Sequence, residues 1–210
     1  MVEIVPAILS KTQEDFERKA REVAGLVNRV QVDLMDGEFV PNKTLQPEEL
    51  PPTPPGSEVE YHLMVKDPEG YIKRIGKKHA TYIFHYESCG EQSGKLAHKI
   101  RAMGSGVGIA ISPDTPAERI KDLVDYSVID TVLVMTVYPG FSGQKYIKAV
   151  EAKIRKIRWW NPGIRIEVDG GVNEKTAPGA IRAGANALAV ASAIFESQNI
   201  RKAIESLSHL

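Results

Sequence analysis

The sequence predicts an α/β fold, a closed barrel in which eight parallel strands alternate with helices, the (β/α)8 or TIM barrel. Two observations predict it. Eight short runs rich in β-branched residues recur along 210 residues, a length at the small end of the range for this fold. Charged amphipathic stretches separate these runs, which is the pattern of repeated βα units. No linker or low-complexity tract interrupts the alternation, so we expect one domain over residues 1–210.

The predicted strands are short, and several are nearly continuous in apolar residues. This is expected of parallel strands that are buried on both faces. The predicted strands are Val2–Leu9, Arg29–Leu34, Glu58–Met64, Thr81–Tyr86, Gly106–Ile111, Thr131–Thr136, Ile164–Val168 and Ala187–Val190.

Seven of the stretches between strands have helical periodicity. Thr12, Asp67 (followed by Pro68) and Asn173 are predicted N-caps, because a short polar side chain there accepts a free amide hydrogen of the first turn. The predicted helices are Gln13–Val27, Glu69–Lys78, Gln92–Met103, Ala117–Leu123, Ile147–Trp159, Glu174–Ala183 and Asn199–Leu207.

The second βα unit departs from this pattern. Its helix is replaced by a proline-rich segment, and proline lacks the N–H donor that a helix needs. We expect a shortened or missing second helix, with at most one turn around Pro47 to Leu50. The prolines of this segment are Pro47, Pro51, Pro52, Pro54 and Pro55.

Composition excludes several classes of protein. Lys+Arg and Asp+Glu both number 27, so the net charge of zero disfavours a general nucleic-acid binder. A single cysteine, Cys89, cannot form an intrachain disulfide, which fits a reducing compartment. Glu3 and Pro6 interrupt the first residues, so these do not have the apolar core of a secretory signal peptide. No apolar run is long enough to cross a membrane. We therefore expect a cytoplasmic protein that binds neither nucleic acid nor membrane.

Polar residues gather at the C-terminal ends of the predicted strands, where TIM barrels place their active sites. Asp33, His62 and Asp169 form a carboxylate–imidazole–carboxylate set, which suits Zn²⁺, Fe²⁺ or Mn²⁺. Gln31 points to the same face as Asp33, because the two are two residues apart on a strand. It could add only a neutral amide oxygen to a metal site.

Other polar residues at the strand ends have alternative interpretations. For Asp36, in Met35-Asp36-Gly37, a turn and a catalytic role are equally consistent with the sequence. His62 taken alone is consistent with a hydrogen-bonded core histidine. We expect His85 and Glu87 to brace the mouth of the barrel rather than to take part in chemistry.

Glycine-rich and small residues follow the last three predicted strands. Glycines allow backbone N–H groups to approach an anion closely, and late loops of TIM barrels frequently bind phosphate. Ordinary turn chemistry is the alternative for each loop taken alone. The candidate phosphate-binding residues are Gly140, Ser142, Gly143, Gly170, Gly171, Ala191 and Ser192. Met35, Met64 and Met135 lie near strand ends, where they fill the core or surround a substrate.

Together these residues resemble the ribulose-phosphate 3-epimerase family over nearly the whole chain. The segments that carry the resemblance are Pro6–Ser10, Val32–Asn42, His62–Val65, Pro113–Pro116, Val134–Gln144 and Val168–Val172. The resemblance implies a phosphate-binding (β/α)8 barrel of the ribulose-phosphate-binding type. It implies interconversion of D-ribulose 5-phosphate and D-xylulose 5-phosphate by proton transfer at C3 through an enediolate. It also implies homo-oligomers.

The resemblance further implies roles for particular residues. Two family aspartates, matching Asp33 and Asp169, act as the acid/base pair and bind a divalent metal together with two histidines. His62 matches one histidine, but Gln31 stands in place of the other. We therefore expect a metal, whether Zn, Fe, Mn or Co, to be bound weakly or with altered preference.

Three further departures distinguish this chain from the family pattern. Ala7 stands where the family has a serine, and Ser142 and Ala191 stand where it has glycines. These departures leave two alternatives open. One is an epimerase of a hexulose 6-phosphate such as allulose 6-phosphate, and the other is a noncatalytic barrel that binds sugar phosphates.

Overall fold

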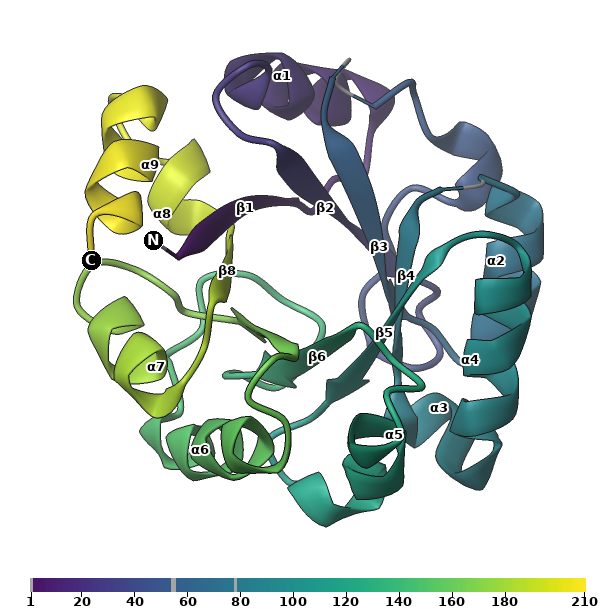
Figure 1. Ribbon diagram of the computed structural model, residues 1–210. Coiled ribbons are helices and arrows are strands. Elements are labelled where there is room, and N and C mark those ends of the chain that lie inside the picture. Colours follow the sequence, from purple (N-terminus) through teal and green to yellow (C-terminus); the bar gives the residue numbers. More distant parts are fainter. Residues whose placement is uncertain (1, 54–55, 78) are drawn as a thin grey trace.

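The computed structural model describes residues 2–53, 56–77 and 79–210, and within them eight parallel strands close into a barrel. Each strand pairs with the next in sequence, and β8 pairs with β1. The helices lie around the outside of the strands (Figure 1). The strands are β1 (Glu3–Ile8), β2 (Arg29–Met35), β3 (Glu58–Met64), β4 (Thr81–His85), β5 (Gly106–Ile111), β6 (Thr131–Met135), β7 (Arg165–Asp169) and β8 (Ala187–Val190). The predicted TIM barrel is confirmed.

Every predicted helix overlaps a helix of the structure, although the bounds differ. The α-helices are α1 (Gln13–Val23), α2 (Pro68–Ile75), α3 (Tyr86–Cys89), α4 (Ser93–Ala102), α5 (Lys121–Asp125), α6 (Glu151–Trp160), α7 (Ala177–Ala183), α8 (Ser192–Phe195) and α9 (Ile200–Ser208). The 3-10 turns are η1 (Pro47–Glu49), η2 (Gly90–Gln92), η3 (Ala117–Ile120) and η4 (Lys148–Val150). Tyr86, predicted as the last residue of the fourth strand, instead begins α3.

Three helices end earlier than predicted, α4 by a single residue and the other two by more, each of these close to a glycine. α1 ends at Val23 rather than Val27, and Gly25 then has a φ of +70°. α2 ends at Ile75, where Gly76 takes the left-handed conformation that closes a helix. Lys78, the predicted end of this helix, lies outside the described residues.

Two of the three predicted caps are confirmed. The side chain of Thr12 accepts the amide hydrogen of Asp15, and that of Asp67 accepts the amide hydrogen of Gly70. The prediction for Asn173 is wrong, because α7 begins only after Thr176. Asn173 Oδ1 accepts from two backbone amides in the turn before that helix, an arrangement that asparagine favours.

The proline-rich second unit has the predicted form. Among the described residues between β2 and β3, the only helical segment is the single turn η1. Pro54 and Pro55 lie outside the described residues. The chain after β2 forms a loop instead, in which Asp36 pairs with Lys43 in an isolated bridge. This loop lies at the C-terminal end of the strands, where the candidate site is expected.

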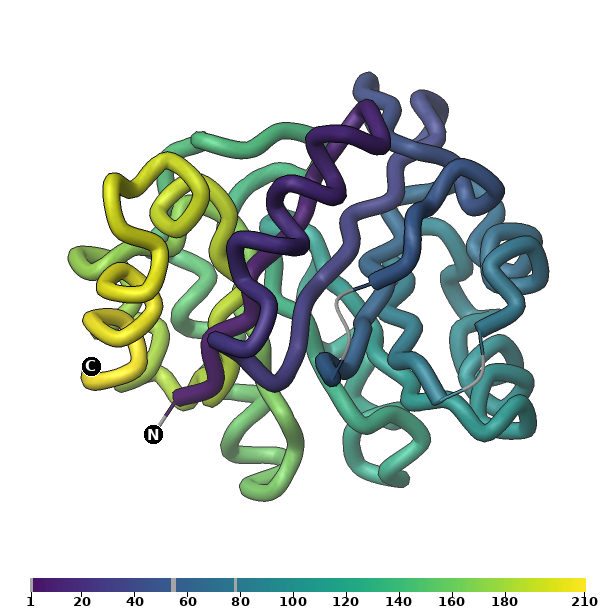
Figure 2. The backbone as a smooth tube through the Cα atoms, turned by 90° about the horizontal axis from the view of Figure 1, so that it is seen from above, coloured from purple at the N-terminus to yellow at the C-terminus, as the bar shows by residue number. Residues whose placement is uncertain are grey.

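The apolar core fills the space between the strands and the helices. Inside the barrel, residues two apart on a strand share a face, so Glu60 lies below His62 on β3 and Glu167 lies below Asp169 on β7. Glu60 and Glu167 are fully buried, and Arg165 Nη1 contacts both, at 3.2 and 2.6 Å. No pattern in the sequence predicted this charged layer. The start of β1 and the C-terminal end of the chain lie near each other in both views of the backbone (Figures 1 and 2).

In the part of the chain that the structure describes, no helix has both the length and the apolar character needed to span a membrane.

Candidate active site

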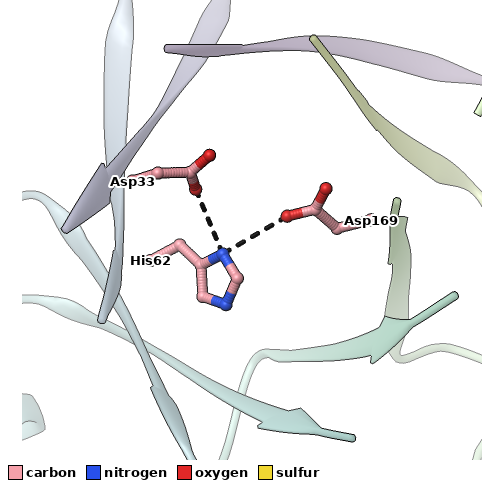
Figure 3. A group of neighbouring side chains, drawn as sticks. All are labelled: Asp33, His62 and Asp169. Carbon is pink, nitrogen blue, oxygen red and sulfur yellow. Dashed lines mark hydrogen bonds and ion pairs between the residues drawn. The ribbon is translucent and has the colours of Figure 1, made fainter. Parts of the chain in front are cut away.

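Four polar side chains from three strands meet inside the barrel. Gln31 Nε2 donates to Asp33 Oδ1 at 2.8 Å and to Asp169 Oδ2 at 2.9 Å. His62 Nδ1 lies 3.1 Å from the same Asp33 oxygen and 3.3 Å from the same Asp169 oxygen. Figure 3 shows Asp33, His62 and Asp169 pointing toward one another from β2, β3 and β7. We call Gln31, Asp33, His62 and Asp169 the site tetrad.

Two threonines tie down the strand ends that carry the aspartates. Thr44 Oγ1 donates to the carbonyl oxygen of Asp33 at 3.0 Å, and it accepts the amide hydrogen of Met35 at the same distance. Thr136 Oγ1 donates to the carbonyl oxygen of Asp169 at 2.9 Å. Both threonines are buried. Each aspartate therefore projects from a backbone that a side chain from a neighbouring segment holds in place.

His62 begins a hydrogen-bonded chain that leads away from the carboxylates, through the buried His85 to the more exposed Glu87. Its Nε2 lies 2.9 Å from His85 Nε2, and His85 Nδ1 lies 3.2 Å from Glu87 Oε2. Glu87 in turn accepts from the amide of Ser112. His85 and Glu87 do not line the pocket, and their hydrogen bonds join the end of β4 to the segment after β5; that they brace the mouth stays a prediction.

The charges of this chain are set by burial and by neighbours. Burial alone would lower the pKa of His62, but hydrogen bonds and charges from Asp169 and Asp33 raise it to about 9. Burial is the main cause that lowers the pKa of His85. A neutral His85 with Nδ1–H directed at Glu87 leaves its Nε2 as an acceptor. A charged His62 therefore donates from Nε2 to His85 and from Nδ1 to the two carboxylates.

The tetrad has a geometry that fits a divalent ion. Asp33, His62 and Asp169 each offer a ligand atom, and these atoms all lie within 4.8 Å of one another. Five distances among the tetrad atoms named above run from 2.8 to 3.5 Å. A tetrahedral ion with bonds of about 2.0–2.1 Å separates its ligand atoms by about 3.3 Å. Asp33, His62 and Asp169 are good metal ligands, and Gln31 could supply an amide oxygen as the fourth ligand.

A pocket opens above the tetrad. All ten of the predicted phosphate-binding and methionine residues line it, together with Asp33 and Asp169. Gln31 and His62 are fully buried and do not line it. Gly140, Ser142 and Gly143 after β6 line this pocket together with Gly170 and Gly171 after β7, so two adjacent loops border one space.

The structure favours one of the two interpretations of Asp36. Its Oδ1 accepts from the amides of Glu38 and Phe39, both at 2.8 Å, and its Oδ2 accepts from the amide of Lys66 at 2.7 Å. It does not line the pocket. Asp36 therefore holds the turn after β2 to the loop after β3.

Two departures from the family pattern lie next to each other. Ala7 on β1 is the register partner of Gln31 on β2, so their side chains share a face of the sheet. Ala7 is 1% exposed and offers no hydroxyl group to the amide beside it. Gln31 Oε1 is buried and has no hydrogen-bond partner among the described residues.

Sequence reasoning missed several residues that shape the site. No sequence pattern distinguishes Thr44 or Thr136, and Asn42 stands out only as part of the Val32–Asn42 motif. Asn42 Nδ2 donates to the carbonyl oxygen of Gly140 at 2.8 Å, which joins two loops of the mouth. The Pro41-Asn42 pair is a turn signal, but no local pattern reveals a partner 98 residues away.

Comparisons with known proteins agree with this geometry. The model of the ribulose-phosphate 3 epimerase family matches residues 3–195. A ribulose-phosphate 3-epimerase of Bacillus subtilis is 35% identical, and the match covers 99% of this chain and 98% of that protein. One from Rhodobacter capsulatus is 36% identical, over 95% of this chain and 88% of that protein. One from Methanocaldococcus jannaschii is 37% identical, over 99% of this chain and 90% of that protein.

Solved structures with low sequence identity share the fold. The 3-hexulose-6-phosphate synthase of Salmonella typhimurium has a TM-score of 0.71 at 16% identity, over 99% of this chain and 97% of that chain. The 3-keto-L-gulonate-6-phosphate decarboxylase of Vibrio cholerae has a TM-score of 0.67 at 12% identity, over 100% of this chain and 95% of that chain. These likenesses extend to the barrel alone. The family match and the full-length relatives go further: this chain belongs to the ribulose-phosphate 3-epimerase family.

Proposed function

We propose that the protein is an epimerase that interconverts D-ribulose 5-phosphate and D-xylulose 5-phosphate. One observation carries the proposal: Asp33 and Asp169 both line a pocket whose wall is formed by two glycine-rich loops. The curated relatives that match nearly the whole chain are named for this reaction. Both the geometry and the family therefore support the same chemistry.

The reaction needs two groups that exchange protons with one carbon. Inverting C3 requires removal of its proton from one face and delivery of a proton to the other, through an enediolate. In our proposal one of Asp33 and Asp169 acts as the base while the other acts as the acid. Their roles reverse in the opposite direction. The cationic His62 between them offsets one unit of the negative charge of the two carboxylates.

The glycine loops have a positioning role in this proposal. The phosphate group would lie against the backbone N–H groups near Gly143 and Gly171 and against Ser192, at the start of α8. Anchoring the phosphate fixes the distance from that group to C3, which places the reacting carbon near the carboxylates. Met35, Met64 and Met135 would surround the carbon chain and limit the access of water.

We also propose that Asp33, His62 and Asp169 hold a divalent ion, with Gln31 as a weaker fourth ligand. When bound, Zn²⁺, Fe²⁺, Mn²⁺ or Co²⁺ stabilises negative charge on the substrate oxygens. An amide oxygen is a poorer donor to these ions than an imidazole nitrogen. The affinity is therefore expected to be lower than in a site with two histidines, or the preferred ion to differ.

Two alternatives have weaker support. An allulose 6-phosphate epimerase would use the same acids, but the three curated relatives described above are named for the pentulose substrate. A noncatalytic sugar-phosphate binder would have no need for two carboxylates at the pocket. Comparison of kcat/KM for the two sugars tests the first alternative: a higher value for allulose 6-phosphate than for ribulose 5-phosphate would favour it. Binding without turnover in every metal would favour the second.

The decisive experiment follows proton exchange at C3 in D2O. The wild type should epimerise ribulose 5-phosphate and incorporate deuterium in at least one of the four metals. Asp33→Asn and Asp169→Asn should each lower kcat/KM by about 10³-fold, in the range for loss of a general acid or base. Each variant should still exchange the C3 proton of one epimer, and the two variants should retain opposite epimers.

The control is Asp122→Asn, which removes an exposed carboxylate from α5 and should leave the rate unchanged. Absence of exchange and turnover in the wild type in all four metals would refute the epimerase assignment. Equal loss of exchange in both epimers for both variants would contradict the division of labour between the two aspartates.

The setting of the protein is part of the proposal. We propose a cytoplasmic homo-oligomer that forms one domain over residues 1–210 and acts on a small ketose phosphate. The single cysteine and the balanced charge support this setting, because they fit a reducing compartment and argue against nucleic acid or membrane as partners.

A further inference from the structure

We propose that Gln31 is a two-position amide: its Nε2 group holds Asp33 and Asp169 together in the ion-free site, and the amide turns over to offer Oε1 when an ion binds. The inference deepens the proposed function, since it rests on the ion site described there. It assigns to this chain a way of keeping its two acids in place that a histidine at the same position does not provide.

The ion-free position is supported by the hydrogen bonds of Nε2. Its two hydrogens go to Asp33 at 2.8 Å and to Asp169 at 2.9 Å, and Gln31 is fully buried. The ligand oxygens of the two carboxylates lie within 4.8 Å of each other, so their charges repel. Hydrogen-bond donors between them offset this repulsion. His62 provides one such donor at Nδ1, and the amide provides the other two. An amide has no net charge, so this contribution does not depend on protonation.

The second position is supported by the other end of the same amide. Oε1 is buried without a partner, and its neighbour Ala7 carries only a methyl group. No described hydrogen bond to Oε1 therefore resists a half-turn of the amide about its last torsion. The two ends of an amide are nearly equal in shape, so the half-turn needs little space.

The half-turn would put the ligand atom Oε1 in the place now held by the hydrogen-bond donor Nε2. Nε2 lies 2.8 to 3.5 Å from the three ligand atoms of Asp33, Asp169 and His62. That spacing matches the separation of about 3.3 Å between ligands of a tetrahedral ion. An oxygen at the same place completes four ligands. The turn breaks both hydrogen bonds of the amide, so ion binding competes with them.

This competition predicts the effect of substitution. In Gln31→His, an imidazole nitrogen replaces the amide oxygen, and no half-turn is needed. The dissociation constant for Zn²⁺, measured by titration calorimetry without substrate, should fall by at least about 10-fold, the lower end of the range for changes to the surroundings of a metal. In Gln31→Leu, which has neither donor nor ligand, Zn²⁺ should bind more weakly than in the wild type.

The amide itself provides a direct test by nuclear magnetic resonance on protein labelled with ¹⁵N at glutamine side chains. The signals of Gln31 are identified by their absence in Gln31→His and in Gln31→Leu. With EDTA present, both NH₂ protons of Gln31 should be shifted downfield and should exchange slowly with solvent. On addition of Zn²⁺ they should move upfield together, and the change should saturate at one ion per chain.

Gln144 is the internal control. Its Nε2 donates to the carbonyl oxygens of Tyr138 at 2.7 Å and Phe141 at 2.9 Å, away from the tetrad. Its signals should not follow the same saturation.

Several outcomes would overturn the proposal. Solvent-like amide protons in EDTA would show that Gln31 does not hold the carboxylates. Zn²⁺ binding that leaves the amide signals unmoved would show that it does not turn, as would Zn²⁺ affinity that is equal in wild type and Gln31→His. Failure of Zn²⁺ to bind the wild type would also refute the second position. None of these readouts uses a sugar phosphate, so they separate this inference from the epimerase assignment.

Discussion

Asn42 and Gly140 join the loop after β2 to the loop after β6 across the mouth of the barrel, through a hydrogen bond of 2.8 Å from Asn42 Nδ2 to the Gly140 carbonyl oxygen. Asn42 is only 7% exposed, and its Oδ1 accepts the amide hydrogen of Lys43. The first of these loops follows Asp33, and the second lines the pocket. The bond therefore couples the strand that carries Asp33 to the candidate phosphate site.

Asn42→Leu should loosen this coupling. We expect the KM for ribulose 5-phosphate to rise about 10-fold and kcat to fall less, because the loop that receives the phosphate loses its anchor. The free energy of unfolding should fall by about 1 kcal/mol, the contribution of a typical hydrogen bond. Steady-state kinetics and urea unfolding measure the two effects.

Asn161→Leu is the matched control for this variant. Asn161 follows α6 and accepts from the amides of Gly163 and Ile164 in the turn before β7, at the other end of the strands. This variant should lose stability without a change in KM. An unchanged KM in Asn42→Leu would show that the bond is structural only.

Gly171→Ala should damage the pocket more than a substitution at a neighbouring glycine. Gly171 has a φ of +63°, and a Cβ there would lie 2.6 Å from the Gln144 carbonyl oxygen and 2.8 Å from the Tyr146 amide nitrogen. The backbone of the β6 loop must therefore shift. We expect a loss of about 2 kcal/mol in stability, in the range for local backbone strain, and at least a 10-fold rise in KM.

Gly143→Ala provides the comparison for the steric term. Gly143 has a similar φ of +75°, but a Cβ there would meet nothing within 4 Å. It should cost only about 1 kcal/mol, the penalty for a left-handed conformation. Equal effects of the two substitutions, measured by urea unfolding and by KM, would contradict the role of the close approach at Gly171.

Glu87 should make the protein sensitive to acid. Burial would raise the pKa of Glu87, but hydrogen bonds from His85, Thr115 and the Ser112 amide lower it to about 2. The folded pKa lies below the unfolded value of about 4.3, so the ionised group stabilises the fold above that pH. This stabilisation should be lost as the pH falls from about 4.3 to about 2.

Glu87→Gln tests this pH dependence. The variant should be less stable than the wild type by about 2 kcal/mol at pH 7, the contribution of hydrogen bonds to a charged group. The difference should shrink as the pH falls from 4.3 toward 2. Urea unfolding at pH 7, 4 and 2.5 measures it, with the exposed Glu174→Gln as the control. A difference that stays constant over this range would argue against the low pKa.

The barrel and much of its site could be predicted from sequence because their signals are local. Apolar runs at strand length and the prolines after β2 fixed the architecture. In a TIM barrel, the C-terminal ends of all strands meet at one mouth. Polar residues at these ends are therefore expected to lie close together, which is why the proximity of Asp33, His62 and Asp169 could be predicted from the sequence.

The remaining features depend on contacts that no local pattern encodes. Thr44 and Thr136 have no distinguishing signal in the sequence. Only the folded barrel shows that they donate hydrogen bonds to the backbone carbonyl oxygens of the two aspartates. The orientation of the Gln31 amide follows only from the positions of both carboxylates. The layer of Glu60 and Glu167 was missed because charged residues are normally found at the surface.

Arg165 stabilises that buried layer, so its loss should affect the fold and not the chemistry. It donates from Nε to Glu3 at 2.8 Å and from Nη1 to Glu60 and Glu167, which are both fully buried. Desolvation by burial and the charge of Glu167 raise the pKa of Glu60. Removing the cation therefore leaves Glu167 without an ion-pair partner among the described residues, and it leaves Glu60 with Arg29 alone, at 3.7 Å. Breaking a buried ion pair from one side costs about 3–5 kcal/mol.

Arg165→Met should lower the free energy of urea unfolding by about 3 kcal/mol or more, while kcat for ribulose 5-phosphate in the folded fraction stays within about 2-fold of the wild type. Arg182→Met, at an exposed position on α7, is the control and should change neither value. A triple substitution of Arg165, Glu60 and Glu167 to apolar residues should recover stability, since no buried charge is then left unpaired. A large fall in kcat for Arg165→Met at full folding would instead link this layer to the positions of His62 and Asp169 above it.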